Sequence, residues 1–295
     1  MRIVHKLAIL SAIMTFFGIV TSTAQAQAPL PENGQGPVNA RVQGEETIPS
    51  NYFAVAFHKP TYILPYYYTG SPDNAAYQNI TPDHERLKNA EIKYQVSLKV
   101  PVWKNIFNCS SSLYAAYTQL SYWQLYNHRT FFRESNYEPE FFLANEINYP
   151  IFQDWHLNFV NPGFVHQSNG DGNALERSWN RVYLEIVTST DNWLINLKPW
   201  YVISTNSKNE DITNYLGYGR ILVAYKFQEQ VFSIQAHNLI EGGGKHATAE
   251  LTWSFPITPY LKGYVDVFSG YGQSLIEYNH RTNSAGIGVT LSDWI

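Results

Sequence analysis

Residues 92–102 read IKYQVSLKVPV, and every second residue in this stretch is apolar. The apolar residues alternate with Lys, Gln, Ser, Lys and Pro, so an extended chain places the two sets on opposite faces. A repeat of two residues is typical of a β-strand, whereas an amphipathic helix repeats about every 3.6 residues. The stretch therefore predicts a strand with one apolar and one polar face.

Similar segments recur about every 15 to 25 residues along the rest of the chain. Many are close to the ~10 residues that a tilted strand needs to cross a membrane. Polar turns such as Glu241-Gly242-Gly243-Gly244 separate them, and no convincing amphipathic helix lies between. The pattern predicts about twelve strands, at 62–68, 92–102, 113–123, 138–149, 155–168, 178–187, 193–203, 215–226, 231–237, 246–255, 260–268 and 285–291.

The first residues of the chain have the features of an export signal. Arg2 and Lys6 precede an apolar run over residues 7–20, and an Ala-x-Ala sequence follows at residues 24–26. The run falls short of the roughly 20 residues that span a bilayer as a helix. We therefore expect a signal peptide over 1–26, a flexible Pro-, Gly- and Gln-rich leader over 27–50, and a barrel over 51–295.

The composition favours a membrane barrel over a soluble sandwich. Aromatic residues make up 16% of the chain, with 22 Tyr and 8 Trp, while charged residues make up only 15%. This balance suits the aromatic girdles of an outer-membrane barrel, in which a closed sheet pairs every backbone group. We expect an all-β fold, a transmembrane antiparallel β-barrel of about twelve strands in the outer membrane of a Gram-negative bacterium.

Cysteine usage and net charge exclude two other classes of protein. The single cysteine, Cys109, cannot form an internal disulfide, which excludes a small disulfide-stabilised secreted domain. The formal net charge of −4 argues against a nucleic-acid partner, because such proteins carry a basic surface.

One hairpin, at residues 166–181, contains groups suited to nucleophilic catalysis. In an extended strand His166 and Ser168 share a face, about 7 Å apart, with Gln167 on the other face. If the turn is centred on Asn173, Asn180 lies opposite His166, with Cβ atoms roughly 5 Å apart. The hairpin would then assemble a Ser-His-Asn triad.

The returning strand of this hairpin predicts which face carries the triad. Asn180 shares its phase with Val182, Leu184 and Ile186, whereas the opposite phase includes Arg181 and Glu185. Apolar side chains of a barrel face lipid and charged ones face the lumen. We therefore expect the triad on the outer face, near the rim, where the ester bonds of phospholipids lie.

The motifs of this hairpin resemble the active-site hairpin of the outer membrane phospholipase A family. They are His166-x-Ser168-Asn169-Gly170 and Arg177-Ser178-Trp179-Asn180-Arg181, and the similarity covers essentially the whole expected barrel. Supporting stretches occur in the family's order: Tyr117-Thr118-Gln119, Trp123-Gln124-Leu125, Phe132-Arg133-Glu134-x-Asn136-Tyr137-Glu138-Pro139, Lys198-Pro199-Trp200-Tyr201 and Ser269-Gly270-Tyr271-Gly272-x-Ser274-Leu275-Ile276.

The resemblance implies a twelve-stranded, integral membrane barrel that hydrolyses acyl ester bonds of phospholipids, depends on calcium and is active as a homodimer. It implies that Ser168 is the nucleophile, His166 the general base and Asn180 the residue that orients the histidine. The backbone N–H of Gly170 would contribute to the oxyanion hole.

The expected calcium ligands depart from the family pattern. Glu176 stands where the family has a serine ligand, and Asp171 stands where the family offers a backbone carbonyl. Both supply oxygen, which Ca²⁺ prefers, so we expect the ion to be retained. Thr130 would replace the serine that the partner subunit contributes. Gln119 matches a glutamine that hydrogen-bonds across the dimer in the family, a contact that contributes ~1 kcal/mol in lipid.

Other interpretations of these residues stay open at this point. A His-x-Ser pair in a strand is usually structural, Asp171 and Glu176 could be solvated loop carboxylates, and Gln119 could bond within its own barrel. As a whole, the chain could be a diffusion porin or a structural outer-membrane barrel, or a lipid-binding barrel without catalysis.

A further group of charged residues is expected to have no catalytic role. We interpret its members as lumen charges in a hydrogen-bonded network: Arg133, Glu134 and Glu138.

Overall fold

The computed structural model describes Val38, residues 55–106 and residues 111–295. The expected signal peptide, the expected leader apart from Val38, and Cys109 lie outside the described residues. Among the residues it does describe, no helix is both long and apolar enough to cross a membrane.

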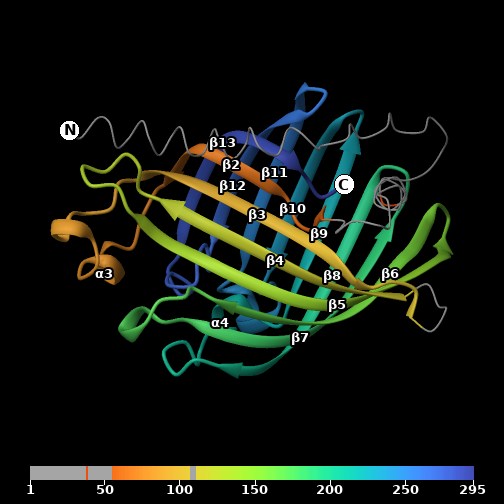
Figure 1. Cartoon of the computed structure of the whole chain (residues 1–295), viewed down its shortest axis with the longest axis horizontal. Helices are drawn as coiled ribbons and strands as arrows, with labels where there is room; N and C mark the ends of the chain where they lie inside the picture. The colour runs from red at the N-terminus through yellow and green to blue at the C-terminus, as the bar shows by residue number, and fades with distance from the viewer. Residues whose placement is uncertain (1–37, 39–54, 107–110) are drawn as a thin grey trace. The chain divides into compact units, whose positions relative to one another are not determined.

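Twelve antiparallel strands form a closed barrel, because each strand pairs with the next along the chain and β13 pairs with β2 (Figure 1). The short strand β1 (Ala56–Phe57) adds to β3. The twelve are β2 (Thr61–Thr69), β3 (Ala90–Trp103), β4 (Ser111–Trp123), β5 (Phe132–Phe152), β6 (Trp155–Ser168), β7 (Ser178–Ser189), β8 (Trp193–Thr205), β9 (Gly219–Phe227), β10 (Gln230–His237), β11 (Thr248–Thr258), β12 (Leu261–Gly270) and β13 (Thr282–Ser292).

The all-β barrel and its strand number were predicted correctly, but most strand boundaries differ by one to three residues, and the starts of two strands differ by more. The expected strand at 215–226 begins only at Gly219, because the short helix α4 (Thr213–Leu216) precedes it. The expected strand at 138–149 begins earlier, at Phe132, and thereby includes Arg133 and Glu134. The other helical segments are short: α3 (Asn74–Tyr77), η1 (Pro82–His84), η3 (Asn173–Leu175) and η4 (Glu241–Gly244).

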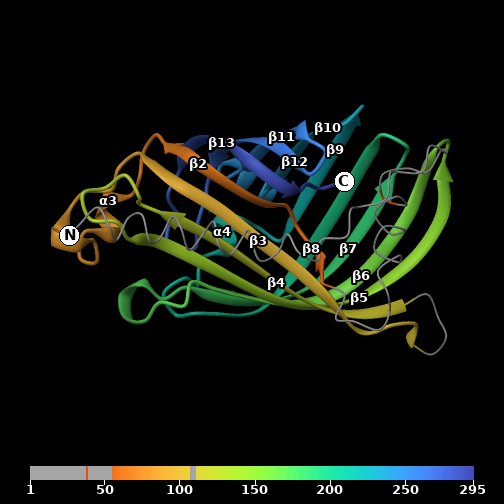
Figure 2. The same cartoon turned by 45° about the horizontal axis from the view of Figure 1, so that its top comes forward.

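The two ends of the barrel differ in the length of their connections. At one end, residues 153–154 join β5 to β6, and residues 228–229 join β9 to β10. At the other end the connections are long, and the one from β2 to β3 contains α3, at the left of Figures 1 and 2. Outer-membrane barrels have short periplasmic turns and longer extracellular loops. Ser168 ends β6 at the long-loop end, which we call the loop rim.

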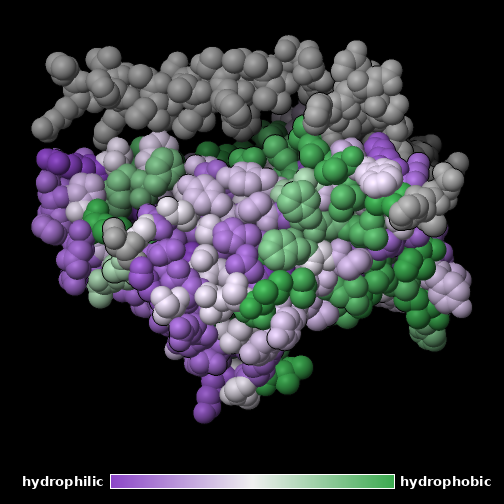
Figure 3. Space-filling model, turned by 60° about the horizontal axis from the view of Figure 1, so that its bottom comes forward, coloured by the Kyte–Doolittle hydropathy of each residue, from purple (hydrophilic) through white to green (hydrophobic). Residues whose placement is uncertain are grey.

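The outer face of the barrel is apolar where the alternation predicts it. Val96 on β3 is 40% exposed, whereas its neighbour Ser97 is fully buried. Lys93, on the polar face of the same strand, is also buried. In the view of Figure 3, hydrophilic side chains gather towards the end with α3, and hydrophobic side chains spread over the other part of the face.

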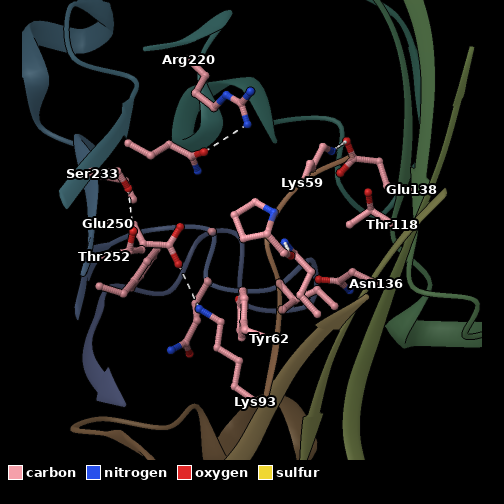
Figure 4. A pocket seen from close by; sticks show the side chains of 18 of the residues that line it. Lys59, Tyr62, Lys93, Thr118, Asn136, Glu138, Arg220, Ser233, Glu250 and Thr252 are labelled. Atoms are coloured by element: carbon pink, nitrogen blue, oxygen red, sulfur yellow. Dashed lines mark hydrogen bonds and ion pairs between the residues drawn. The ribbon is translucent and has the colours of Figure 1, made fainter. Parts of the chain in front are cut away.

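The lumen contains charged groups that pair across the barrel. Lys93 on β3 donates to Asp266 on β12 at 2.6 Å and to Glu250 on β11 at 3.0 Å. Lys59 donates to Glu138 on β5 at 2.6 Å, as Figure 4 shows from inside the barrel. These pairs connect segments far apart in the sequence, since Lys59 lies between β1 and β2, and each charge has an opposite charge beside it in a buried setting.

A second group of lumen charges lies near the loop rim and includes residues expected to be structural. Arg133 on β5 pairs with Glu91 at 2.9 Å and with Glu277 at 2.5 Å. Glu134 accepts from the Tyr77 hydroxyl of α3 and from the backbone N–H of Ile276, both at 2.9 Å. The prediction that Arg133, Glu134 and Glu138 belong to a hydrogen-bonded lumen network is confirmed.

Charged and polar side chains line the part of the lumen that Figure 4 shows. A polar cavity of about 180 Å³ lies among them (Figure 4). Towards the end with short turns, the lumen is filled by a buried apolar cluster that includes Val187, Leu194, Leu222, Ala224 and Val231. A diffusion porin needs an open channel, so this filling does not favour the porin alternative.

The Arg133 network generates a prediction for stability. Arg133→Met leaves Glu91 and Glu277 buried without their cation, so we expect the free energy of unfolding to fall by about 3–5 kcal/mol. Urea unfolding in detergent micelles, followed by tryptophan fluorescence, measures it.

The control for this prediction is Arg129→Met, because Arg129 pairs with Asp83 at 2.8 Å in an exposed position. An exposed pair contributes about 0–1 kcal/mol, so this variant should unfold almost like the wild type. Equal unfolding free energies for the two variants would show that the lumen network does not stabilise the barrel.

Candidate active site

The β6–β7 hairpin has the register that the sequence predicted. His166 lies opposite Asn180, and Ser168 lies opposite Ser178. The pairing is regular from Phe159 up to the loop, so each residue of the rim half of β6 has one partner on β7. The hairpin therefore places Asn180 directly across from His166.

A hydrogen bond joins the two cross-strand partners. The Nδ1 atom of His166 lies 2.9 Å from Oδ1 of Asn180, and both residues are half-buried. A carbonyl oxygen can only accept, so Nδ1 carries the proton in this bond. The other ring nitrogen, Nε2, is then unprotonated and able to accept a proton, on the strand face that also carries Ser168.

This face of the hairpin is the outer face of the barrel. Val182 and Leu184, which share the phase of Asn180, are 41% and 39% exposed. Arg181 and Tyr183, in the opposite phase, are buried in the lumen. The predicted outward phase of Asn180 is thus found in the structure. His166, Ser168 and Asn180 lie together on a surface that faces lipid near the loop rim.

The inward side chains of the hairpin hold its backbone in place. Gln167 accepts through Oε1 from the indole N–H of Trp179 at 2.8 Å and from Arg181 at 2.9 Å. The Arg181 guanidinium also lies over the Trp179 ring, 3.8 Å from its centre. Because Gln167 stands between His166 and Ser168, these contacts fix the strand segment that carries both outward groups.

The loop between β6 and β7 is closed by Asn169. Its backbone N–H donates to the carbonyl of Arg177 at 3.1 Å, and its side-chain Oδ1 accepts from the Arg177 N–H at 3.0 Å. Gly170 follows with φ +69°, and a Cβ at this position would lie 2.9 Å from the Tyr137 ring. Gly170 therefore meets both a conformational and a steric requirement beside Ser168.

The two loop carboxylates expected to bind calcium have different surroundings. Asp171 is exposed and accepts from Asn169 Nδ2 at 3.2 Å, and partial desolvation raises its pKa. Glu176 lies 3.4 Å from Nζ of Lys208, in the loop between β8 and β9. Thr130 lies in a different loop, between β4 and β5.

These donors fit a calcium ion in chemistry but not in number. Ca²⁺ prefers oxygen ligands such as carboxylates, backbone carbonyls and water, and it takes about 6–8 oxygens in all. In the described part of the chain, no group of three or more His, Cys, Asp or Glu side chains is placed to hold a metal. A site built on Asp171 and Glu176 therefore needs further oxygens from backbone, water or a second subunit.

Gln119 on β4 lies in the outward phase, beside the exposed Tyr117. Its Nε2 donates to Ser121 Oγ at 3.1 Å, and its Oε1 accepts from the Tyr117 hydroxyl at 3.3 Å. The amide thus makes the local bonds that one interpretation anticipated. A primary amide has a second N–H and a second lone pair, so it retains capacity for a partner outside the barrel.

One residue beside the triad was not found from the sequence. Nδ2 of Asn180 donates to Oγ of Ser204 on β8 at 2.9 Å. The sequence-based strand ended at residue 203, and strict alternation would have turned Ser204 towards the lumen. Only the observed pairing of β7 with β8 brings this hydroxyl to the outer face.

Comparisons with known proteins show the family to which the chain belongs. A family model described as Phospholipase A1 matches residues 38–291. The phospholipase A1 of Proteus vulgaris is 40% identical over 246 residues, which are 82% of this chain and 83% of the relative.

Two solved structures share the barrel over most of both chains. The Salmonella typhi outer membrane phospholipase dimer with bound calcium is 37% identical, with a TM-score of 0.78, over 83% of this chain and 95% of that chain. The second is an active-site mutant of Escherichia coli outer membrane phospholipase A, in which an asparagine is replaced by alanine. It is 35% identical, with a TM-score of 0.80, over 86% of this chain and 98% of that chain. The chain therefore belongs to the phospholipase A1 family of outer membrane proteins.

Proposed function

We propose that this barrel hydrolyses acyl ester bonds of membrane phospholipids at the loop rim, with Ser168 as nucleophile, His166 as general base and Asn180 as the group that orients the imidazole. The observation that carries the proposal is the 2.9 Å bond between His166 Nδ1 and Asn180 Oδ1, on the outer face that also presents Ser168. Its position at the membrane surface matches the depth of the ester bonds.

The geometry supports the following steps. Nε2 of His166 takes the proton of Ser168 Oγ as the oxygen attacks the ester carbonyl, and the Asn180 carbonyl stabilises the resulting imidazolium at Nδ1. The N–H of Gly170 donates to the oxyanion. The imidazolium then protonates the leaving alcohol, which leaves an acyl-serine that a water molecule hydrolyses with the same base.

An asparagine suits a triad that faces lipid. A carboxylate in this position would place a full charge against a low-dielectric surface, whereas the amide oxygen is neutral and still accepts from Nδ1. The inward anchor of Gln167, Trp179 and Arg181 keeps the outward groups in register without using the lipid-facing side. The hairpin thus separates its structural contacts from its reacting groups.

Calcium and dimerisation complete the proposal. Asp171 and Glu176 would hold the ion, with Thr130 of the partner subunit as a further ligand, and bound calcium would polarise the ester carbonyl. The Salmonella typhi relative is a dimer with bound calcium, which supports both features. Gln119 would contribute a hydrogen bond across the dimer from the outer face of β4.

The first prediction concerns the nucleophile. Ser168→Ala should lower fatty-acid release from phospholipid in mixed micelles roughly a thousandfold or more, because the acyl-enzyme cannot form. The control is Ser269→Ala, which removes another hydroxyl at the loop rim, one that bonds Asn283 at 2.7 Å. Ser269→Ala should retain wild-type activity, and undiminished release by Ser168→Ala would refute the catalytic assignment.

A second prediction concerns the metal. Excess chelator should abolish hydrolysis, and Asp171→Asn or Glu176→Gln should raise the calcium concentration for half-maximal activity about tenfold, because each removes a charged oxygen ligand. Asp154→Asn, in the turn between β5 and β6 at the opposite end of the barrel, is the matched control. Full activity of the wild type in chelator would exclude a calcium requirement.

A third prediction concerns association. Gln119→Leu should weaken the dimer about fivefold, since it removes one hydrogen bond of ~1 kcal/mol in the membrane. Chemical cross-linking in detergent at several protein concentrations measures the shift. An unchanged dimer fraction would assign Gln119 to its local bonds with Tyr117 and Ser121 alone.

A further inference from the structure

We propose that Ser204 is a positioning residue that sets the orientation of the Asn180 amide, and through it the proton position on His166. The inference rests on the proposed function. Asn180 makes two hydrogen bonds with opposite ends of its amide: Oδ1 lies 2.9 Å from His166 Nδ1, and Nδ2 donates to Ser204 Oγ at 2.9 Å. A chain of hydrogen bonds from His166 through Asn180 to Ser204 thus extends the triad onto a third strand, β8.

An irregularity in β8 brings Ser204 to this face. Along β8 the exposed residues Leu197, Tyr201 and Ile203 point outward at odd positions, and then the even-numbered Ser204 is exposed as well. The register shifts at this point, because Asn180 pairs with Ser204 but the next residue of β7 pairs with Val202. Ile203 is therefore the extra residue of a β-bulge.

The bulge has a direct consequence for the site. In a regular strand Ser204 would share the inward phase of Val202, out of reach of Asn180. Bulges re-aim single side chains, and they occur often beside active sites. Here the re-aimed hydroxyl lies on a paired strand rather than on a flexible loop, so its position relative to Asn180 is fixed by the sheet.

The orientation of the amide determines whether His166 can act as a base. The two ends of an asparagine amide are almost identical in shape but opposite in hydrogen-bonding role. With Oδ1 towards His166, Nδ1 carries the proton and Nε2 is free to accept from Ser168. With Nδ2 towards His166, Nδ1 must accept, the proton moves to Nε2, and the base is lost.

Ser204 restrains the Asn180 amide in the position that meets the imidazole, because its oxygen accepts from Nδ2 at the end of the amide that His166 does not contact. At a lipid-facing rim an amide N–H without a partner is costly, so the hydroxyl supplies an acceptor that the surroundings lack. Without Ser204, the amide rotates more freely, so orientations that do not present Oδ1 to the imidazole become populated. Ser204 does not need to touch the substrate for this effect.

The test is a double-mutant cycle at saturating calcium and matched dimer content. Ser204→Ala should lower kcat about fivefold with KM unchanged, the effect of one neutral hydrogen bond, and Ser204→Thr should restore it because the hydroxyl returns. In an Asn180→Asp background, Ser204→Ala should have no further effect. A carboxylate presents an acceptor oxygen to His166 in either orientation and does not need to be oriented.

A merely structural role for Ser204 gives a different result. Ser204→Ala would then lower kcat by the same factor in both backgrounds, and this outcome overturns the proposal, as does wild-type kcat in the single variant. Neither outcome contradicts the proposed function, which the Ser168→Ala variant tests separately.

The tautomer of His166 can also be measured directly, which tests the proposal even if Asn180→Asp is inactive. Nitrogen NMR of protein labelled at histidine should show the His166 proton on Nδ1 in the wild type. In Ser204→Ala a fraction of molecules should carry it on Nε2. Identical tautomer populations in the two proteins would overturn the proposal.

Discussion

The whole structure depends on the requirement that every backbone N–H and C=O within a bilayer has a partner. An unpaired group in hydrocarbon costs several kcal/mol, so a sheet can cross a membrane only if it closes. The pairing of β13 with β2 closes this sheet and leaves no free edge among the twelve strands. Closure also gives each strand two unlike surroundings, lipid outside and a polar lumen inside.

Because of this division, the side chains that stabilise the β6–β7 hairpin and those of the candidate site lie on opposite faces. Inward side chains carry charge and hydrogen bonds, as in the contacts among Gln167, Trp179 and Arg181, and they fix the backbone. Among the outward side chains, Val182 and Leu184 are apolar and exposed, whereas His166 and Asn180 share a hydrogen bond near the loop rim. A polar group on a lipid face is unfavourable and is therefore typical of a functional site.

The alternation of apolar and polar residues explains which features of the fold and the site could be predicted from the sequence. A period of two residues locates strands and faces, and a hairpin centred on Asn173 follows from the spacing of His166 and Asn180, so the register and the outward phase were both correct. The bulge at Ile203 was not predictable, because one inserted residue reverses the phase beyond it without a signature in composition. Ser204 was missed for this reason.

Contacts between distant segments could not be predicted from the sequence either. Lys93 lies on an expected polar face, but its pairing with Asp266 depends on barrel closure, which brings residues 173 positions apart into contact. Likewise Glu176 could be chosen as an oxygen donor, but its ion pair with Lys208 depends on how the β6–β7 and β8–β9 loops meet at the rim. Local pattern determines faces, whereas the closed sheet determines partners.

The central claim is that the outer rim presents an activated serine. Treatment with a long-chain alkylsulfonyl fluoride, followed by peptide mass spectrometry, tests it directly, since an activated hydroxyl displaces fluoride and is covalently sulfonylated. The account predicts a single modified peptide, with the label on Ser168, and loss of labelling in His166→Ala. Labelling that is absent from Ser168, or equally fast without His166, would contradict it.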